Sequence, residues 1–207
     1  GGMYKPLSQP DLENIFDTAL RLLSELGMGE IPNRLRQDLL TAGAQDSEAG
    51  RVVFPRSLTE DAIAKAAKTF VLHGRDETRS IEVGGSKVYF GTGGAAVQTL
   101  DLDSGTYRPS TLADLHNFTR LQDTLANVSW YTRCCVATDV PSNFDLDVNT
   151  AYALLLNTTK PTATSFTLAE YVAPIVKMLD IAAGGKGAFS KRPFMKAHIS
   201  PVISPMR

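Results

Sequence analysis

The feature that most constrains the fold is an alternation of strand-like and helix-like segments through the second half of the chain. Strand-like segments occur at 128–137, 162–166 and 194–199. They alternate with helix-like segments at 111–126, 147–157 and 167–183. Capping pairs, Thr111 with Asp114 and Thr167 with Glu170, open two of the helices. Strands that are joined through helices form right-handed units with parallel strands. This half therefore predicts successive β/α units in one parallel sheet.

The first half begins with a helical lead-in. Ser8, with Asp11 as its reciprocal partner, opens a helix whose apolar residues recur at helical spacing until Gly27 ends it. A second helix is expected over 33–42 and a short strand over 52–54. A capping box of Ser57 with Glu60 predicts a third helix that runs through Lys68.

Beyond Lys68 the apolar period changes from helical spacing to two. Short strands are therefore expected at 69–72, 80–83, 87–90 and 96–100. The Gly84-Gly85 pair suits a hairpin turn between the second and third of these, because such turns need positive φ. We expect residues 1–109 to form an α+β capping region with short antiparallel strands, and residues 110–207 to form the β/α units.

A glycine-rich loop bears on whether the parallel sheet is a doubly wound, nucleotide-binding sheet. The segment Gly91-Thr92-Gly93-Gly94 follows a strand, as in dinucleotide-binding proteins. However, the following residues alternate like a strand, so no helix N-terminus is available for a pyrophosphate. A tight loop or bulge between strands is the favoured interpretation, so nucleotide binding is not expected here. A doubly wound sheet and a closed barrel both stay open at this point.

The composition limits the kinds of binding partner that can be expected. The chain has 207 residues, 43% of them apolar, and a formal charge of −1, which gives no electrostatic reason to expect nucleic acid or a membrane surface. No apolar run spans a bilayer and no secretory signal is evident, so we expect a cytoplasmic protein. The adjacent Cys134 and Cys135 would point to opposite faces of a strand, which favours neither a disulfide nor a metal site.

Several short motifs resemble the trimethylamine methyltransferase family in order and spacing. The resemblance runs nearly from end to end and is carried by Gly2-Met3-Tyr4-Lys5-Pro6-Leu7-Ser8, Leu22–Gly27, Val53-Phe54-Pro55, Gly74-Arg75-Asp76, Gly91–Gly94, Ser110–Leu115, Asn157–Pro161 and Ser200–Arg207. It implies a (β/α)8 TIM barrel that moves a methyl group from a methylated amine, such as trimethylamine or glycine betaine, to a corrinoid protein. The corrinoid would be carried by that partner, and no cofactor would be bound directly.

The resemblance also indicates where substrate would bind. Catalytic groups in such barrels lie at the carboxyl ends of the strands, which are here 138–139, 165–166 and 200–201. A cationic ammonium group suits a carboxylate or an aromatic wall. The candidate substrate-binding residues are therefore Asp139, Ser165, Phe166, Ser200 and Tyr131. Each also has a structural interpretation, as a loop, capping or core residue, and His198 is expected to be a core or supporting residue.

Two classes of function stay open. A complete barrel takes about 250 residues, and only about three barrel strands are visible here, so the expected enzyme needs strands beyond Arg207. The alternative is a non-catalytic fragment or binding module that needs a partner chain to complete the barrel. An open sheet edge is prone to association, so a homo-oligomer or a longer parent chain is expected.

Overall fold

The computed structural model describes residues 4–198 and 206, which form two compact units. One unit comprises residues 4–68 with Met206, and the other comprises residues 69–198. Among the described residues, no helix is both long and apolar enough to cross a bilayer. The predicted boundary between residues 109 and 110 concerns the start of the β/α repeat and stays a prediction.

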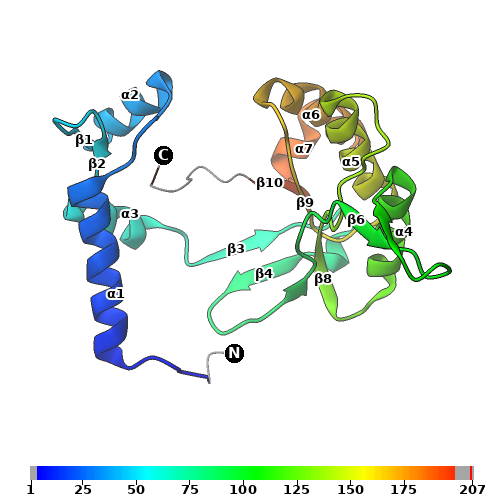
Figure 1. The fold of residues 1–207 in the computed structure, drawn as a ribbon, viewed down its shortest axis with the longest axis horizontal. Coiled ribbons are helices and arrows are strands. Elements are labelled where there is room, and N and C mark those ends of the chain that lie inside the picture. Colours follow the sequence, from blue (N-terminus) through cyan, green and yellow to red (C-terminus); the bar gives the residue numbers. More distant parts are fainter. Residues whose placement is uncertain (1–3, 199–205, 207) are drawn as a thin grey trace. The chain divides into compact units, whose positions relative to one another are not determined.

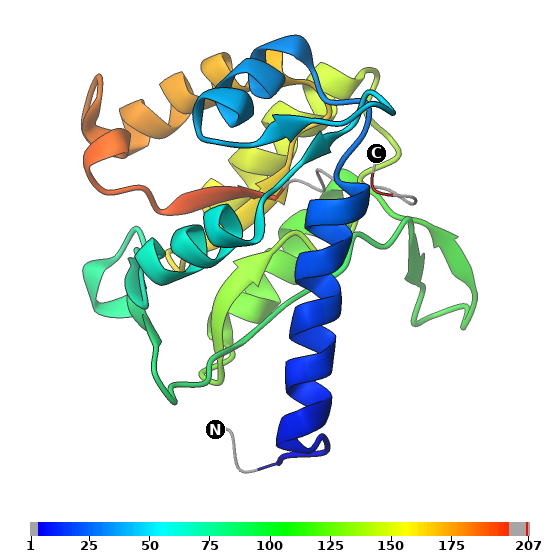
Figure 2. The ribbon, with the colours of Figure 1, turned by 90° about the vertical axis from the view of Figure 1, so that its left-hand side faces the viewer.

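The first unit is mainly helical (Figures 1 and 2). Its elements are α1 (Gln9–Arg21), continued by the π-helical η1 (Leu22–Leu26), then α2 (Asn33–Thr41), β1 (Gln45–Asp46), β2 (Val52–Val53) and α3 (Arg56–Lys65). The expected capping box of Ser8 with Asp11 is confirmed. The strands β1 and β2 pair antiparallel.

Gly27 ends the first helical segment for a steric reason. Its φ is 67°, a conformation that favours glycine, and an added Cβ would lie 2.2 Å from the Val52 carbonyl oxygen. Met28 and Val52 exchange two backbone hydrogen bonds, each 2.8 Å long. The glycine therefore lets the chain turn and lie directly against β2.

The prediction that Ser57 caps the third helix is wrong. Pro55 occupies the N-cap position, α3 begins at Arg56, and Ser57 lies inside the first turn. The Arg56 guanidinium binds the Glu60 carboxylate at 2.8 Å, so Glu60 is not the reciprocal partner of Ser57. The helix ends at Lys65, three residues earlier than expected.

The second unit begins with antiparallel ribbons. The strand β3 (Thr69–Leu72) pairs with β4 (Ile81–Gly84), after the short helix η2 (Glu77–Arg79), and β6 (Gln98–Leu100) pairs with β7 (Tyr107–Pro109) (Figure 1). Gly84 and Gly85 have the expected positive φ values. The expected hairpin between 80–83 and 87–90 is wrong. The strand β5 (Phe90–Gly91) does not pair with β4 and instead pairs parallel with β8 (Val128–Thr132).

A parallel sheet of four strands forms the centre of the second unit. Its strands are β5, β8 (Val128–Thr132), β9 (Thr162–Ser165) and β10 (Met195–His198), and they lie in the order in which they occur in the chain. Between them come α4 (Leu112–Thr124), α5 (Asn143–Asn157), η3 (Ala169–Tyr171), α6 (Val172–Ala182) and α7 (Ala188–Lys191). A doubly wound sheet reverses its strand order at a switch point, whereas this uninterrupted order is compatible with part of an α/β barrel.

Several element boundaries differ from the sequence predictions. The strand expected over 128–137 ends at Thr132, and α5 begins four residues before Asp147, after an N-cap at Ser142. The predicted capping pair of Thr167 with Glu170 is wrong. Instead, the Thr167 amide and hydroxyl both donate to Asp147 Oδ2, at 2.7 and 2.9 Å. Tertiary contact therefore replaces a local cap at the end of β9.

One face of the parallel sheet packs against α5 and α6. Tyr131 from β8 and Met195 from β10 lie 1% and 7% exposed against apolar residues of the two helices, namely Ala151, Leu154, Ile175 and Leu179. Buried apolar side chains of this size contribute about 1.5–3 kcal/mol each. This layer is the main apolar core of the unit, and it fixes which side of each strand faces the helices.

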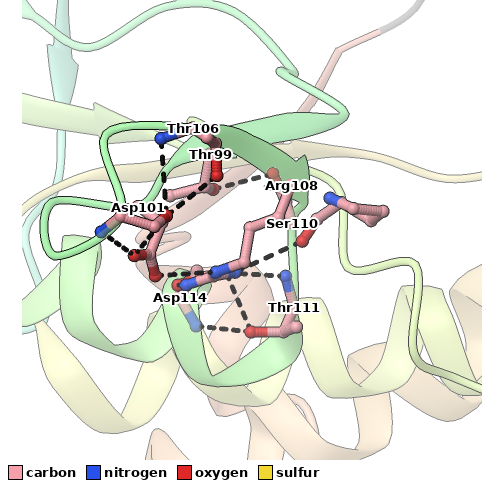
Figure 3. A network of polar contacts seen from close by, with 9 residues as sticks. Thr99, Asp101, Thr106, Arg108, Ser110, Thr111 and Asp114 are labelled. Carbon is pink, nitrogen blue, oxygen red and sulfur yellow. Dashed lines mark hydrogen bonds and ion pairs between the residues drawn. The ribbon is translucent and has the colours of Figure 1, made fainter.

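A charged network joins the β6–β7 ribbon to α4 (Figure 3). The Arg108 guanidinium binds both carboxylate oxygens of Asp114, at 2.6 and 2.9 Å, and Asp114 also caps the helix through Thr111. The Arg108 guanidinium holds the pKa of Asp114 well below its usual range. The capping box that the sequence predicts is thus also a tertiary anchor for the ribbon.

Gly91 offers a test of how β5 enters the parallel sheet. The register shifts between Phe90 and Gly91, and a Cβ on Gly91 would lie 2.0 Å from Cε2 of the Trp130 ring. We expect Gly91→Ala to lower the free energy of unfolding by about 1–3 kcal/mol, the usual cost of overpacking. Gly93→Ala is the matched control, because no atom lies within 4 Å of its added Cβ. Urea unfolding of both variants tests this, and equal stability would contradict the close packing of β5 on Trp130.

Candidate binding site at the carboxyl ends of the parallel strands

The face of the parallel sheet opposite the helices carries polar and charged side chains. Tyr131, Thr162 and Met195 are register partners on the helix-covered face. Their neighbours along the strands point the other way because side chains alternate. We call this second surface the open face; its residues are Trp130, Thr132, Ala163, Ser165, Lys196 and His198.

A cation lies over the aromatic ring of the open face. Lys196 Nζ is 4.8 Å from the centroid of the Trp130 ring. Lys196 is exposed, whereas Trp130 is half-buried and presents only part of its ring to solvent. Cation–aromatic contacts of this kind contribute about 0.5–1 kcal/mol at exposed sites. The ring is therefore oriented so that it can hold a positive group.

The carboxyl ends of the strands hold two charged groups whose hydrogen bonding is incomplete. Arg133 follows β8 directly, and Asp147 lies on the sheet-facing side of α5 with 0% exposure. Arg133 Nη1 and Asp147 Oδ1 are both buried and have no hydrogen-bond partner among the described residues. Burial lowers the pKa of Arg133, and the negative charge of Asp147 opposes this.

Such groups are expensive to leave without partners. A buried polar atom without a hydrogen bond costs about 1–3 kcal/mol, and more if it is charged. Asp147 Oδ2 accepts two hydrogen bonds from Thr167, so Oδ1 is the carboxylate oxygen that lacks a donor among the described residues. Among the described residues, the hydroxyls of Thr132 and Thr150 are likewise buried and lack partners. These side chains, on α5 and at the end of β8, therefore retain unused hydrogen-bonding capacity.

His198 adds a titratable group at the last position of β10. It pairs in register with Ser165, the last residue of β9, so both lie at the carboxyl ends. Burial lowers the pKa of His198, and the positive charges of Lys196 and Arg133 lower it further. The lowered pKa favours the neutral imidazole, which donates a hydrogen bond from one ring nitrogen and accepts one at the other.

The structure distributes the candidate residues unevenly. Ser165 and Phe166 lie at the end of β9 as expected, although Phe166 packs against the apolar core between sheet and helices. Asp139 is exposed, lies seven positions beyond the end of β8, and accepts a hydrogen bond from the Leu112 amide at 2.8 Å. Its carboxylate thus supports the N-terminus of α4. Ser200 lies outside the described residues.

Tyr131 occupies the helix-covered core rather than the open face. Its ring is 1% exposed, and its hydroxyl lies 3.2 Å from Cys134 Sγ. Trp130, one residue earlier, is the aromatic residue that the open face presents. Tyr131 therefore has the core position that its structural interpretation predicts.

Sequence reasoning missed Arg133, Asp147 and Lys196, and it treated His198 as a supporting residue. Arg133 was not identified because the predicted strand continues to Ala137. The carboxyl end of that strand was therefore expected at Thr138. Asp147 carried a usable signal: it shares the helical spacing of the buried Thr150, Ala151 and Leu154. A carboxylate at a core position of an otherwise apolar helix face is rare unless it is paired or functional.

The strand ends hold one buried carboxylate and one partly buried guanidinium, whereas the Trp130 ring lies with Pro161 and Pro193, next to the amino-terminal ends of β9 and β10. Guanidinium groups bind carboxylates through two parallel hydrogen bonds, and a carboxylate or an aromatic ring suits an ammonium group. Within residues 4–198 and 206, no three His, Cys, Asp or Glu side chains gather as a metal site. The arrangement is therefore suited to an organic ion, above all one that carries both signs of charge.

These features define an α/β protein with a polar site at the carboxyl ends of consecutive parallel strands. The family described as Trimethylamine methyltransferase (MTTB) matches residues 2–207, and the chain belongs to that family. The chain is 28% identical over 202 residues to a protein of Desulfitobacterium hafniense (strain DSM 10664 / DCB-2) named trimethylamine methyltransferase MttB. The match covers 97% of this chain and 40% of that relative, so the chain spans less than half of the relative's length.

Substitutions of Asp147 separate its structural role from a binding role. Asp147→Asn keeps an acceptor for Thr167 but removes the negative charge that favours charged Arg133, so we expect the free energy of unfolding to fall, by less than in Asp147→Ala. Asp147→Ala leaves the Thr167 amide and hydroxyl without their acceptor and should lower it by about 1–3 kcal/mol. Chemical unfolding gives both values. If Asp147→Asn destabilises the protein as much as Asp147→Ala, the ionised carboxylate is needed for folding. The interpretation that Oδ1 is left for a ligand is then wrong.

Proposed function

We propose that this chain supplies part of the active site of a methyltransferase that moves a methyl group from a methylated amine to a corrinoid protein. We further propose that the amine is quaternary and bears a carboxylate, as glycine betaine does. The observation that carries the proposal is the pair of buried, incompletely bonded charges on Arg133 and Asp147 at the strand ends. Membership of the trimethylamine methyltransferase family supports the reaction class.

Arg133 is the proposed partner of the substrate carboxylate. Its Nη1 lacks a partner, and its neighbours on the open face, Lys196 and His198, add positive or neutral donors. A simple trimethylammonium ion would meet these cations without gaining a hydrogen bond from Arg133. A carboxylate on the substrate would satisfy the guanidinium, and charge-assisted bonds of this kind are about twice as strong as neutral ones.

The ammonium end of the substrate is proposed to lie toward Asp147. A quaternary ammonium group cannot donate a hydrogen bond from nitrogen, so it is held by charge and by aromatic faces. Asp147 would supply the balancing negative charge from within the helix layer.

A quaternary substrate also simplifies the chemistry that the protein must perform. The bond between nitrogen and one methyl carbon breaks, and the nitrogen keeps the electron pair and leaves as a neutral tertiary amine. No proton has to be delivered to the leaving group. The corrinoid acceptor supplies a Co(I) nucleophile, and the contribution of this chain is to fix the orientation of the methyl group and to exclude water.

The remaining walls of the site are proposed to come from further strands of a (β/α)8 barrel. Within the described residues, β10 pairs with β9 alone, and an uncovered edge is prone to association. On α1, the apolar residues Leu12, Ile15 and Phe16 are 47%, 56% and 44% exposed. These surfaces support a longer polypeptide or a homo-oligomer, in the cytoplasm, as the functional form.

An assay with defined substrates tests the proposed function. The polypeptide translated from the complete reading frame would be incubated with free cobalamin reduced to Co(I), and methylcobalamin would be followed by its absorbance. We expect glycine betaine to be consumed with formation of dimethylglycine. Arg133→Met should lower kcat/KM for glycine betaine by about 100-fold, the usual cost of removing one partner of a buried charge contact.

The controls separate binding of the carboxylate from damage to the fold. Arg120→Met removes an exposed arginine of α4 and should leave the rate unchanged. Trimethylamine and tetramethylammonium lack a carboxylate, so any activity on them should fall little in Arg133→Met. If trimethylamine is the better substrate and Arg133→Met affects every amine equally, the carboxylate proposal fails. If no amine is demethylated, the methyltransferase proposal fails.

A further inference from the structure

A cavity lies in the second unit, between the β6–β7 ribbon and α4. Its volume is about 620 Å³, and its lining includes Leu102 and Arg108 from the ribbon, Asn117 and Phe118 from α4, and the pair Cys134 and Cys135. The proposed substrate contacts Arg133 and Asp147 are not among its lining residues. The two thiols are the nucleophilic groups of this cavity, and the methyl transfer does not use them.

The two cysteines do not follow the geometry expected from the sequence. The strand β8 ends at Thr132, and Cys135 forms an isolated parallel bridge with Ala96. Because the backbone has left the regular strand, both residues line the same cavity instead of lying on opposite faces of a strand. Cys134 is half-buried and Cys135 is 1% exposed, so Cys134 is the thiol that a solute can reach.

The surroundings of Cys134 favour its thiolate. The Cys135 thiol and the Tyr131 hydroxyl both interact with its sulfur, the latter at 3.2 Å. These hydrogen bonds lower the pKa of Cys134, although burial opposes them, whereas the pKa of Cys135 is raised. The charged residues that line the cavity, Asp101, Arg108 and Asp114, are engaged with one another.

We infer that Cys134 is a thiol-modification site, at which a small disulfide of the glutathione type forms a mixed disulfide within the cavity. The Cys134 sulfur attacks one sulfur of the small disulfide, the S–S bond breaks, and one thiolate leaves with the electron pair. The small disulfide is the oxidant, and the cavity provides room for the half that stays attached. Cys135 and Tyr131 act as hydrogen-bond donors to the attacking sulfur.

The modification has a consequence for the strand end. Cys134 directly follows Arg133, and an adduct on its sulfur breaks the contact with Tyr131. If the proposed function is correct, occupation of this cavity therefore weakens substrate binding at Arg133. This consequence rests on the proposed function, whereas the modification itself does not and is tested without any activity measurement.

Intact-mass measurement tests the site directly. The folded chain would be incubated with oxidised glutathione at pH 7 and digested under non-reducing conditions to locate the adduct. We expect one glutathione per chain, attached to Cys134 and released by dithiothreitol. Cys134→Ser should form no adduct. Tyr131→Phe keeps the core ring, removes one donor and should slow the reaction by about threefold for each unit that the thiol pKa rises.

The alternatives each overturn the proposal. Attachment to Cys135, or a product two hydrogen atoms lighter that retains no glutathione, would show that Cys134 does not hold a ligand in this cavity. Reaction of both thiols only after unfolding in urea would show that the cavity does not admit the disulfide. Circular dichroism of each variant before the reaction identifies any loss of fold, and Cys135→Ser, which should still be modified at Cys134, provides the matched control.

Discussion

The parallel register of β8, β9 and β10 is the constraint on which the rest of the second unit depends. It places Tyr131, Thr162 and Met195 side by side under the helices, and it therefore places Lys196 and His198 on the opposite face. A shift by one residue would exchange the two sets and would bury a lysine in the apolar core. The apolar contacts with α5 and α6 thus determine indirectly which polar side chains meet at the carboxyl ends of the strands.

Local signals in the sequence were sufficient to find most of the elements. The boxes at Ser8 and Thr111 are confirmed, and the added contact of Arg108 with Asp114 leaves the cap at Thr111 in place. The box at Thr167 fails because Asp147, twenty residues earlier, takes both of its donors. The strand β5 was assigned to a hairpin because its two residues carry no sign of the parallel partner that lies almost forty positions further along.

The binding site was harder to predict than the fold because its position depends on where one strand ends. Extending β8 from Thr132 to Ala137 moved the expected site from Arg133 to Asp139, which instead supports the N-terminus of α4. The same early end of β8 turns Cys134 and Cys135 toward one cavity. The proposed substrate site and the proposed thiol site therefore both involve residues that continue a β-like sequence after the regular strand has stopped.

The central claim is that Arg133 and Asp147 hold a zwitterionic methylated amine. The most direct test is to titrate the isotopically labelled chain with glycine betaine and to follow the side-chain Nε resonance of Arg133 and the carboxyl carbon of Asp147 by NMR. Both signals should move saturably with glycine betaine, and the Arg133 signal should stay in place with tetramethylammonium chloride at equal ionic strength. An Arg133 signal that does not move, or that moves equally with both compounds, would contradict the proposal.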